Sequence, residues 1–154
     1  MFVNRKRILV EFGDCDPAGI VFFANYFRWF DDCTTALFLA AGFPIAALFS
    51  AHGVVGIPVV EATARFLAPS TQGDALVVES SVTDVRTSSF VIEHRFYHGR
   101  ELLLEGKETR VWATEHPAKP GRLKAQPLPP ELVTKLTGKR TKAAKKRPGA
   151  RRVR

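Results

Sequence analysis

The spacing of hydrophobic and polar residues predicts one long helix early in the chain. From Asn25 to Ala41, aromatic and aliphatic residues recur at steps of three and four, the spacing of one helix face. Gly42 follows, and glycine is common just after a helix end. Phe27 and Phe38 fall off the main stripe, so much of the helix circumference is apolar. We therefore expect a sheet to wrap around this helix.

Much of the remaining chain has the pattern of β-strands. Arg7 to Phe12 is short, rich in branched residues and followed by a glycine, which favours an opening strand. Four further strands are expected near residues 56–66, 75–84, 89–98 and 102–114. The third alternates most clearly, with four side chains assigned to one face: Phe90, Ile92, His94 and Phe96.

The connections predict how these strands pair. His98-Gly99-Arg100 is typical of a tight hairpin turn. Gly106, inside the last strand, is expected to mark a bulge or a close backbone approach. Short helices are expected within residues 44–50 and 130–137. One buried helix followed by hairpin-linked strands predicts an α+β fold, with a five-stranded antiparallel sheet wrapped around one long helix.

Charge divides the chain into a body and a tail. Residues 135–154 hold ten of the 23 basic residues and no acidic residue, which leaves 13 basic against 15 acidic residues elsewhere. The net charge of +8 therefore belongs to the tail, and the body is slightly acidic. We expect one folded domain over residues 1–134 and a basic, disordered tail over 135–154.

Several functional classes are disfavoured by what the sequence lacks. No apolar run approaches the roughly 18 residues of a membrane span, and the first residues lack the apolar stretch of a signal peptide. Cys15 and Cys33 form no CxxC pair, so we expect a reduced, cytoplasmic protein. Nucleotide-binding, zinc-binding and serine-hydrolase motifs are absent, so we expect no metal and no cofactor.

Residues 13–21, Gly-Asp-Cys-Asp-Pro-Ala-Gly-Ile-Val, form a loop with two carboxylates directly before the helix. Such a loop can be a simple turn, in which Asp and Gly supply local hydrogen bonds and positive φ angles. Alternatively, a carboxylate beside the free N–H groups of a helix start could perform chemistry. Those groups would polarise an acyl carbonyl, and the Asp could attack it or deprotonate a water.

The run Glu11-Phe-Gly-Asp-Cys-Asp16-Pro-Ala-Gly-Ile-Val21, with Asn25-Tyr26 and Arg28-Trp29-Phe30-Asp31, closely resembles the 4-hydroxybenzoyl-CoA thioesterase family of hotdog-fold enzymes. Shorter similarities occur at residues 53–59, 89–91 and 109–111. The resemblance covers roughly residues 6 to 126 and excludes the basic tail. It implies a hotdog fold and hydrolysis of an acyl-CoA thioester to an acid and free coenzyme A.

The resemblance also implies roles for individual residues. Asp16, and not Asp14, matches the catalytic aspartate, which acts as a nucleophile or general base. The backbone N–H of Phe23 is expected to donate to the thioester carbonyl, which agrees with the helix-dipole argument. Asp31 matches the aspartate that faces the 4-hydroxyl group of the aryl substrate.

The sequence departs from the family pattern at the pocket and at the coenzyme site. Phe22 and Phe23 stand where relatives usually carry Tyr, Trp or His, so Phe22 makes the mouth of the substrate pocket more apolar. The basic group that binds the coenzyme A phosphates is only partly retained, as Arg86, Arg122 and Lys124.

The resemblance further implies a homo-oligomer, a dimer or tetramer with its sites between subunits, acting on an acyl-CoA substrate. We expect an aryl acyl group, 4-hydroxybenzoyl or a close relative. One alternative is a broad thioesterase for short or medium aliphatic acyl-CoA. A second alternative is an anion or nucleic-acid binding module acting through Lys135 to Arg154, although that segment has no aromatic residue for base stacking.

Overall fold

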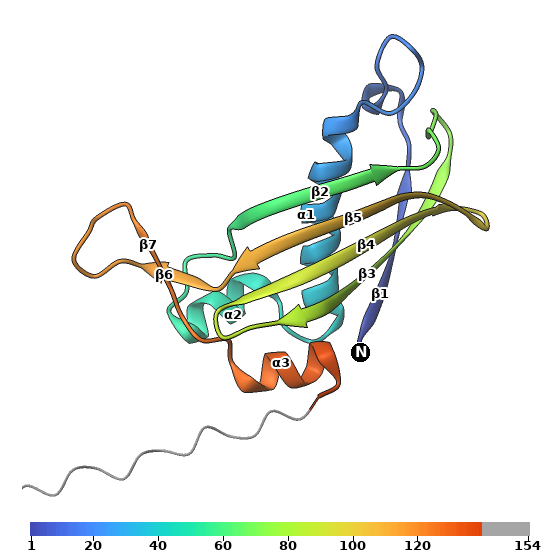
Figure 1. Ribbon diagram of the computed structural model, residues 1–154. Helices are drawn as coiled ribbons and strands as arrows, with labels where there is room; N and C mark the ends of the chain where they lie inside the picture. Colours follow the sequence, from blue (N-terminus) through green and yellow to red (C-terminus); the bar gives the residue numbers. More distant parts are fainter. Residues whose placement is uncertain (140–154) are drawn as a thin grey trace, which may run out of the picture.

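A computed structural model, described here for residues 1–139, shows a five-stranded antiparallel sheet that curves around one long helix (Figure 1). The strands are β1 (Val3–Leu9), β2 (Val59–Phe66), β3 (Ala75–Val85), β4 (Ser89–His98) and β5 (Glu101–Val111). They lie in the order β1-β3-β4-β5-β2, so that β1 and β2 form the two edges. The predicted α+β hotdog architecture is confirmed.

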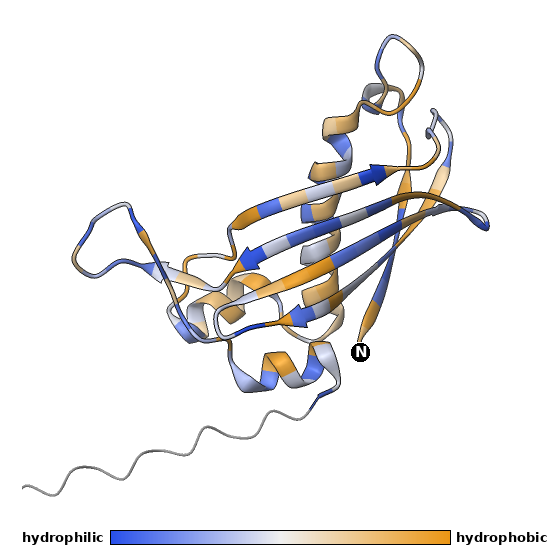
Figure 2. Ribbon diagram, in the orientation of Figure 1, coloured by the Kyte–Doolittle hydropathy of each residue, from blue (hydrophilic) through white to orange (hydrophobic). Residues whose placement is uncertain are grey.

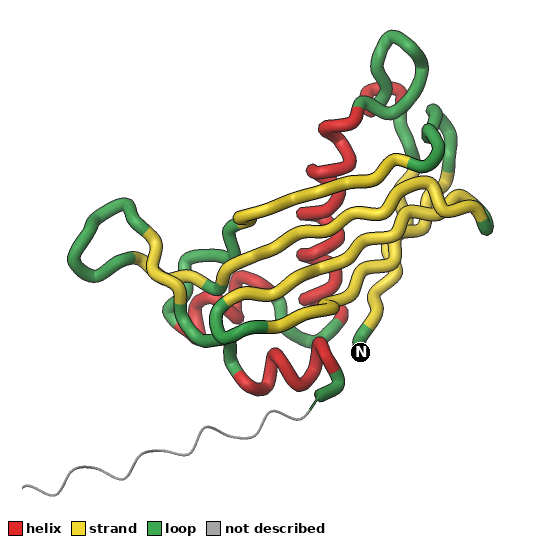
Figure 3. The backbone as a smooth tube through the Cα atoms, in the orientation of Figure 1, coloured by secondary structure: helices red, strands yellow, loops and turns green. Residues whose placement is uncertain are grey.

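The helices lie on one face of the sheet and at one end of it (Figure 3). They are α1 (Phe23–Ala40), α2 (Ile45–His52) and α3 (Pro130–Thr137), preceded by a 3-10 turn, η1 (Phe12–Asp14). Both short helices were expected. Within residues 1–139 no single helix is long and apolar enough to cross a membrane, although α1 and α2, bent by 73°, reach that length and composition together.

A small hairpin formed by β6 (Ala113–Glu115) and β7 (Leu123–Ala125) was not predicted. Each strand has only three residues, too few to show an alternating pattern.

The helix α1 buries one broad face against the sheet. Seven of its residues are buried: Tyr26, Trp29, Phe30, Cys33, Thr34, Leu37 and Phe38. Leu39, by contrast, is 61% exposed, so the sheet covers only part of the circumference in a single chain. The expected alternation in β4 is confirmed, because all four side chains assigned to one face are buried under the helix. Figure 2 shows hydrophobic and hydrophilic residues alternating along the strands.

Gly106 in β5 allows α1 to approach the sheet closely. A Cβ atom added at this glycine would overlap the ring of Phe30, which lies directly over the strand. The same ring stacks on His94 at a centroid distance of 4.8 Å. The predicted close approach is therefore confirmed, while the register shift between β4 and β5 occurs elsewhere, between Phe96 and Tyr97.

Two predicted boundaries are wrong. The opening strand is Val3–Leu9 instead of Arg7 to Phe12, because its basic residues lie on a sheet edge where Arg5 pairs with Glu79 at 2.7 Å. The packed domain also continues past residue 134, since Leu136 is buried and its carbonyl accepts a hydrogen bond from Phe2 N–H at 2.9 Å. Residues 140–154 of the predicted tail lie outside the described residues.

Candidate active site

The loop before α1 holds Asp16 by backbone hydrogen bonds. The Asp16 N–H donates to the Ile20 carbonyl and the Gly19 N–H donates to the Asp16 carbonyl, each at 2.9 Å. Gly19 has φ of +81°, a conformation that favours glycine. The Ala18 N–H donates to Asp16 Oδ1 at 2.8 Å, and Oδ2 has no partner within residues 1–139. One carboxylate oxygen is thus anchored and the other is available.

Asp14 has a different environment from Asp16. Its Oδ1 accepts from Arg28 at 3.0 Å, and its Oδ2 accepts from the Glu11 N–H at 2.9 Å. Its carbonyl accepts from the Phe22 N–H at 2.9 Å and from the Asn25 side chain at 2.8 Å. Asp14 Oδ2 therefore closes the turn at Glu11, while Oδ1 and the carbonyl fasten the loop to the start of α1, which agrees with the expectation that Asp14 shapes the turn.

The start of α1 presents unpaired backbone N–H groups next to this loop. Phe22 precedes the helix and makes no side-chain cap, and the Phe23 N–H donates to no group in the described part of the chain. The first N–H groups of a helix have no intrahelical acceptor and lie at the positive end of its dipole. The side chains of Phe22 and Phe23 are both exposed.

An apolar pocket of about 350 Å³ lies beside the helix start. It is lined by Ile20, Val21, Phe23, Tyr26, Phe66, Leu67, Ala68 and Pro69. Burial raises the pKa of Tyr26, so its hydroxyl stays protonated and donates to Ser70 Oγ at 3.0 Å. The pocket can accept an apolar part of an acyl group next to the Phe23 N–H.

Asp31 lies about two turns further along α1, in a separate groove of about 460 Å³. Its side chain is 69% exposed in the single chain, and not buried as a helix wrapped by sheet would suggest. Arg110 Nη2 donates to Asp31 Oδ1 at 2.8 Å. The groove wall is otherwise largely apolar, with Ile57 and Leu123 among its residues.

Sequence reasoning missed the charged residues beneath this groove. Glu108 and Arg110 are buried between α1 and the sheet, where they pair with each other and Glu108 also contacts His94. They occupy alternate positions of β5, which could have indicated a shared face. The neighbouring positions on the other face, Lys107 and Thr109, are also polar, so the alternation did not show which face was buried.

The residues predicted to bind the coenzyme phosphates do not meet Asp16 within one chain. Arg86 is 79% exposed near the β3–β4 turn and lies 3.6 Å from Asp84. Lys124 lies in β7, and Arg122 is the residue directly before that strand. Figure 1 shows both places at the opposite end of the sheet from the loop that contains Asp16. A second copy of the chain would be needed to bring these groups to one site.

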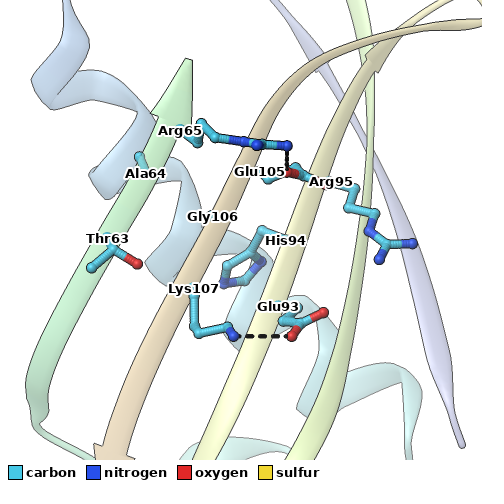
Figure 4. A pocket seen from close by; sticks show the side chains of 9 residues that line it. All are labelled: Thr63, Ala64, Arg65, Glu93, His94, Arg95, Glu105, Gly106 and Lys107. Carbon is cyan, nitrogen blue, oxygen red and sulfur yellow. Dashed lines mark hydrogen bonds and ion pairs between the residues drawn. The ribbon is translucent and has the colours of Figure 1, made fainter. Parts of the chain in front are cut away.

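A further pocket, of about 410 Å³, lies on the outer face of the sheet (Figure 4). Its charged side chains pair across neighbouring strands, as Arg65 with Glu105 at 2.6 Å and Lys107 with Glu93 at 3.3 Å. His94 contributes to the floor of this pocket, but its ring points inward and is fully buried. Both carboxylates of the outer pocket are therefore held in ion pairs.

Comparison with known proteins shows the family of this chain. Residues 10–136 match the model of the thioesterase-like superfamily. The chain is 34% identical to 4-hydroxybenzoyl-CoA thioesterase of Pseudomonas sp. strain CBS-3 over 130 residues, which cover 80% of this chain and 90% of that protein.

Solved structures give the same result. The structure of that Pseudomonas enzyme has a TM-score of 0.78 at 32% identity, covering 86% of this chain and 98% of the other. The structure of a gentisyl-coenzyme A thioesterase has a TM-score of 0.74 at 31% identity, covering 87% and 99%. Sequence family and fold agree, and the chain belongs to the thioesterase-like superfamily.

Proposed function

We propose that this protein hydrolyses an aryl-CoA thioester, 4-hydroxybenzoyl-CoA or a close relative, to the free acid and coenzyme A. One observation carries the proposal: Asp16 has a free Oδ2 in a fixed loop directly before the unpaired N–H of Phe23. The similarity to 4-hydroxybenzoyl-CoA and gentisyl-CoA thioesterases supports an aryl acyl group. The reaction needs no metal or redox cofactor in this proposal.

The chemistry follows from the charge that develops on the thioester. As the carbonyl carbon is attacked, its oxygen becomes negative, and the Phe23 N–H and the α1 dipole stabilise that charge. Asp16 acts in one of two ways. In one, its carboxylate attacks the carbon, the C–S bond breaks to release coenzyme A thiolate, and water hydrolyses the resulting mixed anhydride. In the other, it takes a proton from the water that attacks the carbon, and the C–S bond then breaks to release coenzyme A and the free acid.

The acyl group is the part of the proposal that the pockets inform. The apolar pocket beside Phe23 suits an aromatic ring and an aliphatic chain equally well, so it does not distinguish the two classes of substrate. Asp31 adds a carboxylate whose Oδ2 could accept from a hydroxyl on the acyl group, a donor that an aliphatic chain does not supply. We therefore favour a hydroxylated aryl substrate over the aliphatic one. The nucleic-acid alternative depends on a tail of which residues 140–154 lie outside the described part of the chain.

We infer that the active form is a dimer or tetramer. The edge strand β1 carries consecutive basic residues, whereas the edge strand β2 exposes Val59, Val60 and Phe66. Basic residues protect an edge from pairing, while an apolar, exposed edge favours it. A second copy would also bring Arg86, Arg122 and Lys124 toward an Asp16 loop, where they would bind coenzyme A phosphates.

Cys15 and Cys33 are free thiols, in keeping with a cytoplasmic location.

A substrate panel with two matched variants tests the proposal. The wild type should hydrolyse 4-hydroxybenzoyl-CoA and benzoyl-CoA faster than acetyl-CoA or octanoyl-CoA. Asp16→Asn should keep the fold and lose at least about 100-fold in kcat. Asp14→Asn, which alters a neighbouring carboxylate with a structural role, should lose far less. Near-normal turnover by Asp16→Asn would exclude Asp16, and a preference for octanoyl-CoA would favour the aliphatic alternative.

A further inference from the structure

Four buried side chains form a continuous polar chain between α1 and the sheet. Ser80 Oγ lies 2.8 Å from His94 Nδ1, and His94 Nε2 lies 3.3 Å from Glu108 Oε2. Arg110 donates from Nε and Nη2 to the two oxygens of Glu108, each at 3.0 Å. All four residues are buried. We refer to Ser80, His94, Glu108 and Arg110 as the buried polar chain.

The hydrogen bonds of this chain have a defined direction. Burial raises the pKa of Glu108, but hydrogen bonds from His94 and Arg110 outweigh burial and leave that pKa below its usual range. Glu108 is therefore a carboxylate at neutral pH, and a carboxylate only accepts. His94 Nε2 must then carry a hydrogen atom to donate to Glu108, while the other ring nitrogen, Nδ1, lies within hydrogen-bond distance of the Ser80 hydroxyl. The Arg110 guanidinium is held in one orientation.

The buried polar chain ends at the groove that contains Asp31. Arg110 also donates from Nη1 to the Ile57 carbonyl at 3.3 Å and from Nη2 to Asp31 Oδ1 at 2.8 Å. The Arg110 side chain is 5% exposed, whereas that of Asp31 is 69% exposed. Asp31 Oδ2 has no partner within residues 1–139. A rigid interior cation thus fixes one oxygen of an accessible carboxylate and leaves the other available.

Stability alone does not account for the bond between Arg110 and Asp31. Glu108 already neutralises Arg110 in the interior through two hydrogen bonds. An additional pair in which one partner is exposed to solvent contributes little to folding. The bond does, however, restrict the rotation of the Asp31 side chain at the edge of a largely apolar groove.

We propose that Arg110 is a positioning residue that fixes Asp31 to accept a hydrogen bond from a hydroxyl group on the acyl moiety. This inference rests on the proposed function, in which Asp31 contacts the substrate. The ligand class is an uncharged aryl group with a phenolic hydroxyl. An acyl group without the hydroxyl gives Asp31 Oδ2 no donor, and one that ends in a carboxylate is repelled by Asp31.

The test compares two substrates that differ only in the hydroxyl group. We measure kcat and KM for 4-hydroxybenzoyl-CoA and benzoyl-CoA with the wild type and Arg110→Lys. Lysine keeps the charge but loses the planar fork that holds Asp31 and Glu108 together. The kcat/KM for 4-hydroxybenzoyl-CoA divided by that for benzoyl-CoA should fall by roughly three- to ten-fold, the effect of losing one hydrogen bond. Kinetics with benzoyl-CoA should change much less.

Arg65→Lys is the matched control for this substitution. Arg65 lies on the neighbouring strand β2 and pairs with Glu105 on the outer face, away from the groove. It should leave the substrate ratio unchanged. If Arg110→Lys slows both substrates equally, Arg110 supports only the fold and the inference is overturned.

Asp31→Ala, measured in parallel, separates this inference from the proposed function. If Asp31→Ala leaves the ratio unchanged, Asp31 does not contact the hydroxyl group, and its proposed role and this inference both fail. If Asp31→Ala lowers the ratio and Arg110→Lys does not, only the positioning role of Arg110 is overturned. Adding Asp31→Ala to Arg110→Lys should lower the ratio no further than Asp31→Ala does alone.

A second variant covers the case in which thermal unfolding shows that Arg110→Lys does not fold. Glu108→Gln is nearly isosteric, but its amide group presents N–H donors toward Arg110 and His94 and so releases the guanidinium. The substrate ratio should fall in the same direction as for Arg110→Lys. An unchanged ratio in folded Glu108→Gln would overturn the inference.

Discussion

The two faces of the sheet carry similar charged residues in opposite surroundings. On the outer face, one residue from each strand forms a row of alternating charge across the sheet: Arg5, Glu79, Arg95, Glu105 and Arg65. On the inner face, Glu108 and Arg110 pair beneath α1 with almost no exposure to solvent. We call the first set the outer charge row. Both sets contain good ion pairs, and only burial distinguishes them.

This difference determines what each charge contributes. Exposed ion pairs in the outer charge row are screened by water and contribute little to the free energy of unfolding. Removing one partner of a buried pair leaves an uncompensated charge in a medium of low polarity, which is strongly destabilising. The outer charge row keeps the uncovered face polar, whereas the inner pair holds one orientation of groups between α1 and the sheet.

Removing a carboxylate from each face gives the largest expected contrast. Glu108→Ala leaves the buried Arg110 without its buried, negatively charged partner and should lower the free energy of unfolding by about 3–5 kcal/mol. Glu105→Ala, three residues earlier on the same strand, should cost at most about 1 kcal/mol. Urea unfolding of both variants measures the difference. Equal losses would mean that burial does not separate the two faces.

Gly106 tests the packing of the inner face without changing any charge. Gly106→Ala places a Cβ against the Phe30 ring, so the helix or the strand must shift, at a cost of about 1–3 kcal/mol. Gly56→Ala is the control, because an added Cβ there meets no atom closer than 4.0 Å. Combining Gly106→Ala with Phe30→Leu should cost less than the sum of the two single changes. Strict additivity would contradict the overlap.

The contrast between the two faces also explains which buried positions could be predicted from the sequence. The β4 pattern of Phe90, Ile92, His94 and Phe96 showed a buried face because the other face of that strand is polar. In β5 both faces carry charges, so the inner pair of Glu108 and Arg110 could not be told from the outer residues. Burial there is set by α1, which is far away in the sequence.

The candidate site shows the same division between local and long-range information. The loop around Asp16 was predicted from residues that are consecutive in the chain, and its hydrogen bonds are local. The partner of Asp31 was not predicted, because Arg110 lies 79 positions later and meets it only after the sheet forms. The roles of Asp16, Phe23 and Asp31 in catalysis and binding stay predictions.

Acid pH should weaken the inner face through Glu108. Because the pKa of Glu108 is below its usual range in the folded state, its contribution is present at neutral pH and is lost as the pH falls through that lowered value. The groups facing Glu108 are His94, Arg110 and the Thr34 hydroxyl. The difference in unfolding free energy between wild type and Glu108→Gln should therefore shrink on acidification. A difference that is constant from neutral pH to about pH 3, measured by urea unfolding, would contradict this.

The outer charge row should give the smallest effect, and salt should remove it. Arg65 and Glu105 lie 2.6 Å apart, but their side chains are 71% and 36% exposed, so water and ions compete with the pair. A double-mutant cycle with Arg65→Ala and Glu105→Ala should give a coupling of about 0.2–1 kcal/mol at low ionic strength. Near 1 M salt, where the screening length is about 3 Å, the coupling should approach zero. A coupling above about 2 kcal/mol that persists in salt would mean that this face is covered in the assembled protein, because only desolvation makes such a pair resistant to screening.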